Sequence, residues 1–389
     1  MQAIEIKPNI YWVGAIDWSM RSFHGYSTSR GSSYNAYLII DEKITLIDTV
    51  KTPFYGELIS RISSVIDPAK IDYIISNHVE PDHSGSINLL ITHYAKNATI
   101  VTSDPQGLKG LTARYGALKY KPVKSGDELS IGKRTLKFVA TPMLHWPDSM
   151  VTYCPEEKIL FSNDAFGQHI ATSNRFDDEN DLHAVMEEAK KYYANILMLY
   201  GKQAQSALKA LSSLDIGIIA TGHGIIWRKH ILAILASYEK WSEGEIDDAK
   251  AVVVFDTMWG STEKIAREIT DAFTERGIAV SYFDLRCDHI SDVITEVLTS
   301  KYLAVGSPTI NNQMMPPVAA LLCYLKGFAP KGRSAIAFGS YGWGGQSIKL
   351  VEDELRAAGC DIATDMIRVQ NVPTKEQLKE IREKIISMK

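Results

Sequence analysis

The sequence has little cysteine, and none of it is paired. Its four cysteines, Cys154, Cys287, Cys323 and Cys360, are dispersed over 389 residues without a C-x-x-C motif. A thiolate zinc knot and a redox dithiol require closely spaced cysteines, and a disulfide framework requires a regular set of them. The spacing therefore argues against these three kinds of site, and we expect four buried, inert thiols.

Long apolar runs are also absent. No uninterrupted stretch of the sequence approaches the roughly 18 apolar residues that a membrane-spanning helix needs. The first residues, 1–8, show neither a basic leader followed by an apolar core nor a cleavage pattern. We therefore expect a cytoplasmic protein that does not enter a membrane.

Charge of one sign is not in large excess. The formal net charge is -4, with 45% hydrophobic and 23% charged residues, which are the proportions of a soluble globular protein. This balance gives no support for binding nucleic acid, so small molecules or other proteins are the expected partners. Because a domain usually has about 100–200 residues, a chain of this length predicts two domains.

A hexapeptide rich in potential metal ligands follows an apolar, strand-like segment at residues 71–75. It contains His78, Glu80, Asp82 and His83. Imidazole and carboxylate ligands suit borderline or hard metal ions, and the lack of cysteine argues against an iron–sulfur centre. Taken alone, the hexapeptide fits either a polar turn with solvated charges or a metal site.

Three further potential ligands each follow a strand-like segment in the same way. They are His145 after residues 136–139, Asp164 after residues 159–161, and His223 after residues 216–220. One such residue is usually an ordinary turn residue, but four such places in one chain favour a shared site. Two metal ions about 3.5–4 Å apart need several protein groups and a bridging carboxylate. The sequence therefore predicts a dinuclear metal site.

An acidic, polar stretch at residues 239–250 predicts a domain boundary, which gives domains at 1–248 and 249–389. After this stretch, strand-like and helical segments alternate strictly. Such βα repetition predicts a parallel sheet with helices on both faces and with ligands at the carboxyl ends of its strands.

Three strand-end loops of the second domain predict a flavin site. The first, at residues 256–263, offers hydroxyls and backbone amides at a helix N-terminus, which bind phosphate. It lacks the lysine of a nucleoside-triphosphate loop, and the G-x-G-x-x-G of a dinucleotide site is also missing, which leaves a monophosphate such as that of FMN. The residues assigned to the flavin are Thr257, Met258, Trp259, Gly260, Ser261, Thr262, Ser307, Pro308, Thr309, Asn311, Asn312, Ser340, Tyr341, Gly342, Trp343 and Gly344.

These motifs carry a resemblance that covers the whole chain. The first domain resembles a metallo-β-lactamase-like αββα sandwich, but it has Glu80 where the zinc hydrolases of that superfamily place the second histidine of H-x-H-x-D-H. A further carboxylate makes the ligand set harder and favours iron over zinc. The second domain resembles flavodoxin, a doubly wound parallel sheet. Together they resemble the two-domain flavodiiron proteins.

The resemblance implies a ligand arrangement. One iron would be bound by His78, Glu80 and His145, the other by Asp82 and His223, and Asp164 would bridge them. His83 is a ligand in the zinc hydrolases but turns away from the metal in some flavodiiron proteins. His24 and Tyr200 fall in segments that approach the substrate pocket in relatives, and both could equally have structural roles.

The resemblance also implies the reaction and its partners. Dioxygen would be reduced to water, or nitric oxide to nitrous oxide, at the di-iron centre with electrons from FMN. Since no further redox module follows, a separate donor such as rubredoxin or a reduced deazaflavin is expected. A head-to-tail homodimer or a dimer of dimers would bring each flavin to the partner's iron.

Two other classes of protein share parts of this pattern. A zinc-dependent hydrolase with an appended flavodoxin domain would have the same fold, but it should have histidine at position 80. A plain electron carrier would keep the flavin loops, but it should have lost metal ligands, and all six expected ligands are present.

Overall fold

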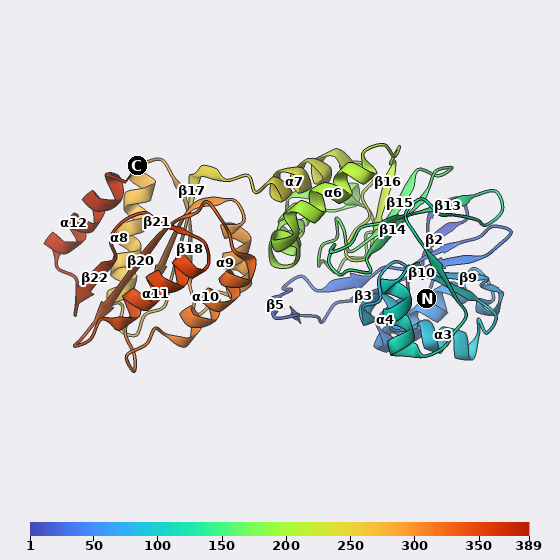
Figure 1. The fold of residues 1–389 in the computed structure, drawn as a ribbon, viewed down its shortest axis with the longest axis horizontal. Coiled ribbons are helices and arrows are strands. Elements are labelled where there is room, and N and C mark those ends of the chain that lie inside the picture. Colours follow the sequence, from blue (N-terminus) through green and yellow to red (C-terminus); the bar gives the residue numbers. More distant parts are fainter. Residues whose placement is uncertain (389) are drawn as a thin grey trace. The chain divides into compact units, whose positions relative to one another are not determined.

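The structure is a computed structural model that describes residues 1–388. It divides into two compact units, Met1–Glu243 and a second unit from Gly244 onward (Figure 1). Helix α7 (Ile231–Glu243) ends the first unit, and strand β17 (Asp247–Phe255) begins close to the start of the second. The last residue of the predicted domain 249–389 lies outside the described residues.

The first unit contains two sheets that enclose a common core. The larger sheet has, in spatial order, β1 (Ile4–Lys7), β2 (Ile10–Trp12), β7 (Tyr37–Ile39), β8 (Thr45–Ile47), β9 (Tyr73–Ser76), β10 (Thr99–Ser103) and β11 (Tyr120–Val123). The smaller sheet has β12 (Glu128–Ser130), β13 (Thr135–Ala140), β14 (Met150–Cys154), β15 (Ile159–Asn163) and β16 (Ile218–Thr221). Apolar side chains of both sheets, such as Ile75 and Phe161, belong to one buried cluster, so the sheets pack face to face.

Helices cover the outer face of the larger sheet. They are α1 (Tyr55–Ser63), α3 (Ile87–His93) and α4 (Gln106–Tyr115). Their apolar residues, among them Leu58, Leu90 and Leu111, share a second buried cluster with Leu46 and Ile74 of the sheet. The central strands are therefore buried on both faces, which explains their continuous apolar character. On the other side of the unit, α6 (Gly201–Leu211) and α7 pack against each other beside the smaller sheet (Figure 1).

Parallel pairing aligns the carboxyl ends of neighbouring strands within each sheet of the first unit. Strands β8, β9, β10 and β11 pair in parallel, and so do β15 and β16 in the smaller sheet. The carboxyl ends of parallel neighbours lie at the same edge of a sheet. Loops that follow these strands can therefore meet although they are distant in the sequence.

Three local features differ from the sequence expectation. Part of the ligand hexapeptide forms a short helix, α2 (Pro81–Ser84), because proline is favoured at the first position of a helix. The sequence also predicts one helix at residues 181–198, but the structure divides this segment into α5 (Leu182–Tyr192), a π-helical turn (Tyr193–Leu197) and a 3-10 turn (Met198–Tyr200). The amphipathic helices α6 and α7 were not singled out in the sequence.

The second unit is a six-stranded parallel sheet with helices on both faces. Its spatial order is β18 (Ala279–Asp284), β17, β19 (Ser300–Gly306) and β20 (Ser334–Tyr341), with β21 (Asp361–Ile362) and β22 (Ile367–Gln370) both paired to β20. The helices are α8 (Ser261–Glu275), α9 (Ile290–Val297), α10 (Pro316–Phe328), α11 (Gln346–Ala357) and α12 (Lys375–Ile386). The strand order reverses between β17 and β19, and ligands bind at such a point in doubly wound sheets.

The thiols are not all buried, which corrects the sequence expectation. Cys154 and Cys360 are buried, and burial raises the pKa of their thiols to about 12 and about 11. Cys287 and Cys323 are exposed, because one lies in the turn after β18 and the other on the solvent side of α10. Among residues 1–388, no helix is long and apolar enough to cross a membrane.

Candidate metal centre and flavin-binding loops

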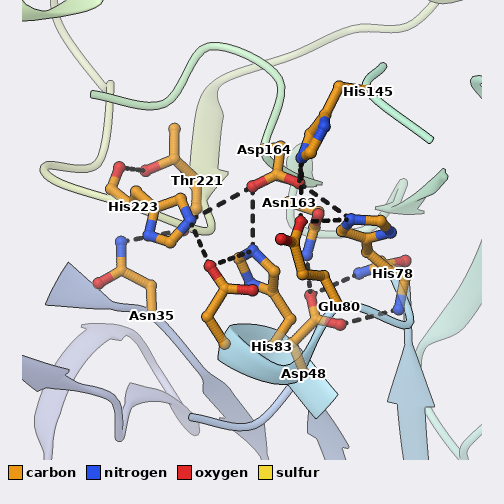
Figure 2. A network of polar contacts seen from close by, with 12 residues as sticks. Asn35, Asp48, His78, Glu80, His83, His145, Asn163, Asp164, Thr221 and His223 are labelled. Atoms are coloured by element: carbon orange, nitrogen blue, oxygen red, sulfur yellow. Dashed lines mark hydrogen bonds and ion pairs between the residues drawn. The ribbon is translucent and has the colours of Figure 1, made fainter. Parts of the chain in front are cut away.

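Seven side chains from five chain segments gather at the edge where the parallel strands of the first unit end (Figure 2). Each of the five segments follows a strand or lies in the short helix α2, and this position brings their side chains close together. They are His78 and Glu80 after β9, Asp82 and His83 in α2, His145 after β13, Asp164 after β15, and His223 after β16.

The first group consists of His78, Glu80 and His145. The Nε2 atoms of the two histidines lie 3.2 Å and 3.1 Å from Oε2 of Glu80. His78 is completely buried, and Glu80 is 5% exposed. Two imidazole nitrogens and a carboxylate oxygen thus face one small volume, as the ligands of one metal ion do.

The second group consists of Asp82, His83 and His223, all buried. Oδ2 of Asp82 lies 3.3 Å from Nε2 of His223 and 3.6 Å from Nε2 of His83. The structure therefore places the His83 imidazole among these groups.

Asp164 lies between the two groups. Its Oδ2 is 3.7 Å from Nε2 of His78 and 3.5 Å from Nε2 of His145. Its Oδ1 is 2.9 Å from Nε2 of His83 and 3.4 Å from Nε2 of His223. One oxygen thus faces each group, which is the geometry of a bridging carboxylate.

The buried polar atoms of this cluster fit a pair of cations. Both carboxylate oxygens of Asp82, Oδ2 of Asp164 and Nδ1 of His83 are buried and have no hydrogen-bond partner. Buried polar atoms without partners are costly and point to an absent ion or water. The donors are oxygen and nitrogen with no sulfur, a set that suits iron.

The pKa shifts show how tightly these groups interact. Burial alone would raise the pKa of Glu80, but hydrogen bonds with His145, His24 and His78 outweigh it and hold that pKa far below its usual range. Burial lowers the pKa of His223, yet the carboxylates of Asp164 and Asp82 raise it to about 10. The opposite directions of these shifts show that the carboxylates and His223 stabilise each other's charged forms, as groups that would share a bound cation can do.

Two histidines are oriented by partners that the sequence did not reveal. Nδ1 of His78 donates to Oδ2 of Asp148 at 2.9 Å, and the same oxygen accepts from the backbone N–H of Val79 at 2.8 Å. Nδ1 of His223 donates to the carbonyl of Ser33 at 2.7 Å. These bonds direct the Nε2 atoms at the metal sites. Only the closeness of Asp148 to His145 in the sequence could have suggested its role.

Of the two predicted pocket residues, both in the described part of the chain, His24 contacts the ligand cluster and Tyr200 does not. Nε2 of His24 lies 2.7 Å from Oε1 of Glu80, and its side chain, on the hairpin of β4 (Ser22–Phe23) and β5 (Tyr26–Ser27), is 56% exposed. No ring or hydrogen-bond contact found within residues 1–388 joins Tyr200 to the seven side chains. Instead the ring of Tyr192, which the sequence analysis missed, lies 6.2 Å from that of His223.

The predicted flavin residues lie in three neighbouring loops that follow β17, β19 and β20. Oγ1 of Thr257 accepts from the N–H of Gly260 at 3.0 Å. The hydroxyls of Thr262, in the first turn of α8, and Ser340, at the end of β20, lie 2.9 Å apart, and this bond connects the first segment to the third. The three loops therefore form one assembled surface at the strand ends.

This surface fits a flavin mononucleotide. Gly260 has a φ of 80° at the start of the 15-residue helix α8, and a Cβ at this position would meet only open space. The first N–H groups of α8 have no acceptors within the helix and bind phosphate. Trp259 and Trp343 are 94% and 97% exposed, so both aromatic side chains are free to contact a flavin ring.

Comparison with known proteins covers both units. A family model described as ODP family beta lactamase matches residues 33–224, and a flavodoxin model matches residues 253–385. A nitric oxide reductase from Moorella thermoacetica is 46% identical over 389 residues, 98% of this chain and 97% of that protein. A rubredoxin-oxygen oxidoreductase from Megalodesulfovibrio gigas is 41% identical over 393 residues, 99% of this chain and 98% of that protein.

Solved structures show the same architecture over the whole chain. The crystal structure of the flavodiiron protein from Giardia intestinalis has a TM-score of 0.97 and 41% identity, covering 100% of this chain and 96% of that chain. This similarity confirms the fold class expected from the sequence, a metallo-β-lactamase-like domain followed by a flavodoxin-like domain. The chain belongs to the flavodiiron proteins, a family of oxidoreductases.

Proposed function

We propose that this protein reduces dioxygen to water, or nitric oxide to nitrous oxide, at a pair of iron ions, with electrons supplied through FMN. The observation that carries this proposal is the position of Asp164, whose two oxygens face two separate groups of buried ligands. The names of the nitric oxide reductase and the rubredoxin-oxygen oxidoreductase similar to this chain support both substrates.

His78, Glu80 and His145 would hold one iron, and Asp82, His83 and His223 the other, with Asp164 between them. The iron pair, when bound, supplies the electrons and the open coordination positions that a diatomic gas requires. The buried hydrogen bonds to Nδ1 of His78 and His223 keep these side chains in place during turnover.

We propose that His24 delivers protons, which both reactions consume. Its Nε2 contacts Oε1 of Glu80, while half of its side chain faces solvent. A group that reaches both the ligand cluster and solvent can carry a proton between them. The ring of Phe23 lies 4.1 Å from that of His24 and 6.0 Å from that of His223, so the hairpin packs directly against the ligand cluster.

The second unit would hold the flavin. The amides and hydroxyls of residues 257–262 would bind the FMN phosphate, and the loops at 307–312 and 340–344 would contact its ring. FMN, when bound, accepts electrons from the donor and passes them on one or two at a time. The proposed donor is a rubredoxin, as in the name of the relative from Megalodesulfovibrio gigas, or a reduced deazaflavin.

The exposed thiols support a cytoplasmic location for this activity. Cys287 and Cys323 are both free and exposed. Exposed free thiols persist in reducing compartments, where donors of low potential are also kept reduced.

One anaerobic experiment tests the proposal. The iron- and FMN-loaded protein is reduced chemically and then mixed with dioxygen or with nitric oxide, and the consumption of each gas is followed with an electrode. We expect turnover of at least one gas, with water or nitrous oxide as product. If neither gas is consumed by fully loaded protein, the proposed function is wrong.

We also expect a functional oligomer, either a head-to-tail homodimer or a dimer of dimers. The flavin loops and the metal ligands lie in different units of the chain, and a two-fold dimer can supply both flavin-to-metal contacts at once. The exposed Trp259 and Trp343 side chains offer apolar area for such a contact. Light scattering after size exclusion should give the mass of two or four chains. An active monomer would contradict this expectation.

Substitution of Gly260 tests the flavin loops. Gly260→Val places a β-branched residue at a φ of 80°, a backbone conformation that costs roughly 1–2 kcal/mol for an L-residue. The loop should move out of its phosphate-binding shape, and FMN affinity should fall about 10-fold. Flavin absorbance per chain measures the loss, and the iron content should not change.

The matched control is Gly277→Val, at the other end of α8. Gly277 has a φ of 76° and equally open surroundings, so the backbone penalty is the same. FMN affinity should stay at the parental value in this variant. An equal loss of FMN in both variants would show that general destabilisation, rather than the loop, is responsible.

A further inference from the structure

We propose that Asp48 is a positioning residue that sets the spacing of the two metal sites, by fixing the residues directly before the metal ligands of both sheets. This inference rests on the metal pair of the proposed function. Asp48 lies directly after β8, is 3% exposed, and belongs to the polar network around the ligands (Figure 2).

The Asp48 carboxylate connects two asparagines. Its Oδ1 accepts from the backbone N–H of Asn77 at 2.8 Å, and its Oδ2 accepts from Nδ2 of Asn77 at 3.0 Å and from Nδ2 of Asn163 at 3.2 Å. Asn77 directly precedes His78, and Asn163 directly precedes Asp164. Each asparagine is thus held one residue away from a ligand.

The same network extends to a third ligand. The carbonyl of Asn163 accepts from the N–H of Gly222 at 2.6 Å, and Gly222 directly precedes His223. A Cβ on Gly222 would lie 2.8 Å from Cε1 of His83, so the backbone here already contacts the ligand shell. The residues before His78, Asp164 and His223 are therefore joined in one hydrogen-bond network, in which Asp48 connects Asn77 to Asn163.

These bonds cross between the two sheets. Asp48 and Asn77 follow β8 and β9 of the larger sheet, whereas Asn163 and Gly222 belong to the ends of β15 and β16 of the smaller sheet. The larger sheet supplies His78 and the smaller sheet supplies Asp164. Other hydrogen bonds also cross between the sheets, such as the bond from Tyr37 to the carbonyl of Thr221. The bond from Asn163 to Asp48 differs from these because it ends directly beside Asp164.

The backbone conformations of Asp48 and Asn163 also indicate that this network is constrained by its surroundings. Asp48 has a φ of 55° and Asn163 has a φ of 51°, in the left-handed region that only aspartate, asparagine and glycine adopt readily. Residues kept in this region are held by their surroundings and cluster at functional sites. Here the surroundings are the hydrogen bonds of the Asp48 carboxylate.

Asp48 forms no hydrogen bond with any of the seven proposed ligands among the bonds found in residues 1–388. Its hydrogen bonds therefore act on the ligands through Asn77 and Asn163. Loss of a hydrogen-bond partner that orients ligands typically weakens metal binding by about 10- to 100-fold. We expect a loss in this range when the network is broken, without loss of the fold.

Cobalt binding by metal-free protein tests this inference. The parent and the variants Asp48→Asn and Asn163→Gly are freed of metal with a chelator and titrated with Co²⁺, and the visible Co²⁺ bands give affinity, stoichiometry and ligand geometry. Asparagine keeps the backbone preference of Asp48 but removes its charge, and glycine at position 163 adopts positive φ without cost. Both variants should bind at least one of the two Co²⁺ ions about 10- to 100-fold more weakly, with changed bands.

The control is Asp41→Asn in the same unit. The Asp41 side chain is 2% exposed and forms an ion pair with Arg134 at 3.2 Å, but it lies before β8 rather than after it. This variant should melt at a lower temperature and bind two Co²⁺ ions like the parent.

The cobalt-binding results of the three variants distinguish a positioning role of Asp48 from a general effect of buried carboxylates. Parental Co²⁺ affinity and unchanged bands in Asn163→Gly would overturn the inference, even if Asp48→Asn does not fold, because the bonds between Asp48 and Asn77 remain in that variant. Equal weakening in Asp41→Asn would also overturn it, since any buried carboxylate would then matter. A parent that cannot bind two ions would instead refute the metal pair itself.

Discussion

Asp164→Asn should bind no more than one iron per chain and lose gas reduction. The substitution is almost isosteric, but a neutral amide offers only one oxygen and cannot bridge two cations. Because two like charges held close together need a shared anion, the second ion should not stay bound. A metal ion contributes several kcal/mol to catalysis, so turnover should fall by about 1000-fold or more.

Iron per chain and gas consumption are measured on the same preparation. The control is again Asp41→Asn, which removes a buried carboxylate of the same unit that lies away from the cluster, and which should keep two irons and parental turnover. Full iron content in Asp164→Asn would contradict the bridging role of Asp164.

Glu80→His should change the metal preference of the site from iron to zinc. Oε2 of Glu80 faces the imidazoles of His78 and His145, so a third imidazole at this place would give a softer and less anionic ligand set. Softer sets favour zinc, whereas hard carboxylates favour iron. Protein produced with both metals available should then contain more zinc than iron, and gas turnover should fall in proportion to the iron lost.

Elemental analysis of the variant and the parent provides this comparison. Unchanged iron content and unchanged gas reduction in Glu80→His would contradict our account of position 80. The same analysis separates the proposed oxidoreductase from a zinc-dependent hydrolase with an appended flavodoxin domain. An active parent that contains zinc and no iron would favour the hydrolase.

The positions of the candidate ligands could be predicted because they depend on local patterns. Each segment that carries a ligand follows a buried strand, and strands that pair in parallel end at one edge. This rule places the loops that carry Asp164 and His223 at one edge of the smaller sheet, whereas their meeting with His78 depends on how the two sheets pack. The flavin loops could be found for the same reason, since they follow three strands of one parallel sheet.

Other features depend on contacts between distant residues and left no local signal. Asp48 is 29 residues from Asn77 and 115 residues from Asn163, and no periodicity or motif connects them. Tyr192 reaches His223 because α5 ends there in a π-helical turn, and such turns follow from packing. The orientation of His83 was also open, because it depends on neighbours from both sheets.

The most direct test of the metal pair is anomalous scattering at the iron absorption edge from crystals of the anaerobically purified protein. Our account predicts two peaks about 3.5–4 Å apart, with the Asp164 carboxylate between them. One peak should lie next to Nε2 of His78 and His145, and the other next to Nε2 of His83 and His223. A single peak, or two peaks whose anomalous signal rises on crossing the zinc edge and not on crossing the iron edge, would contradict it.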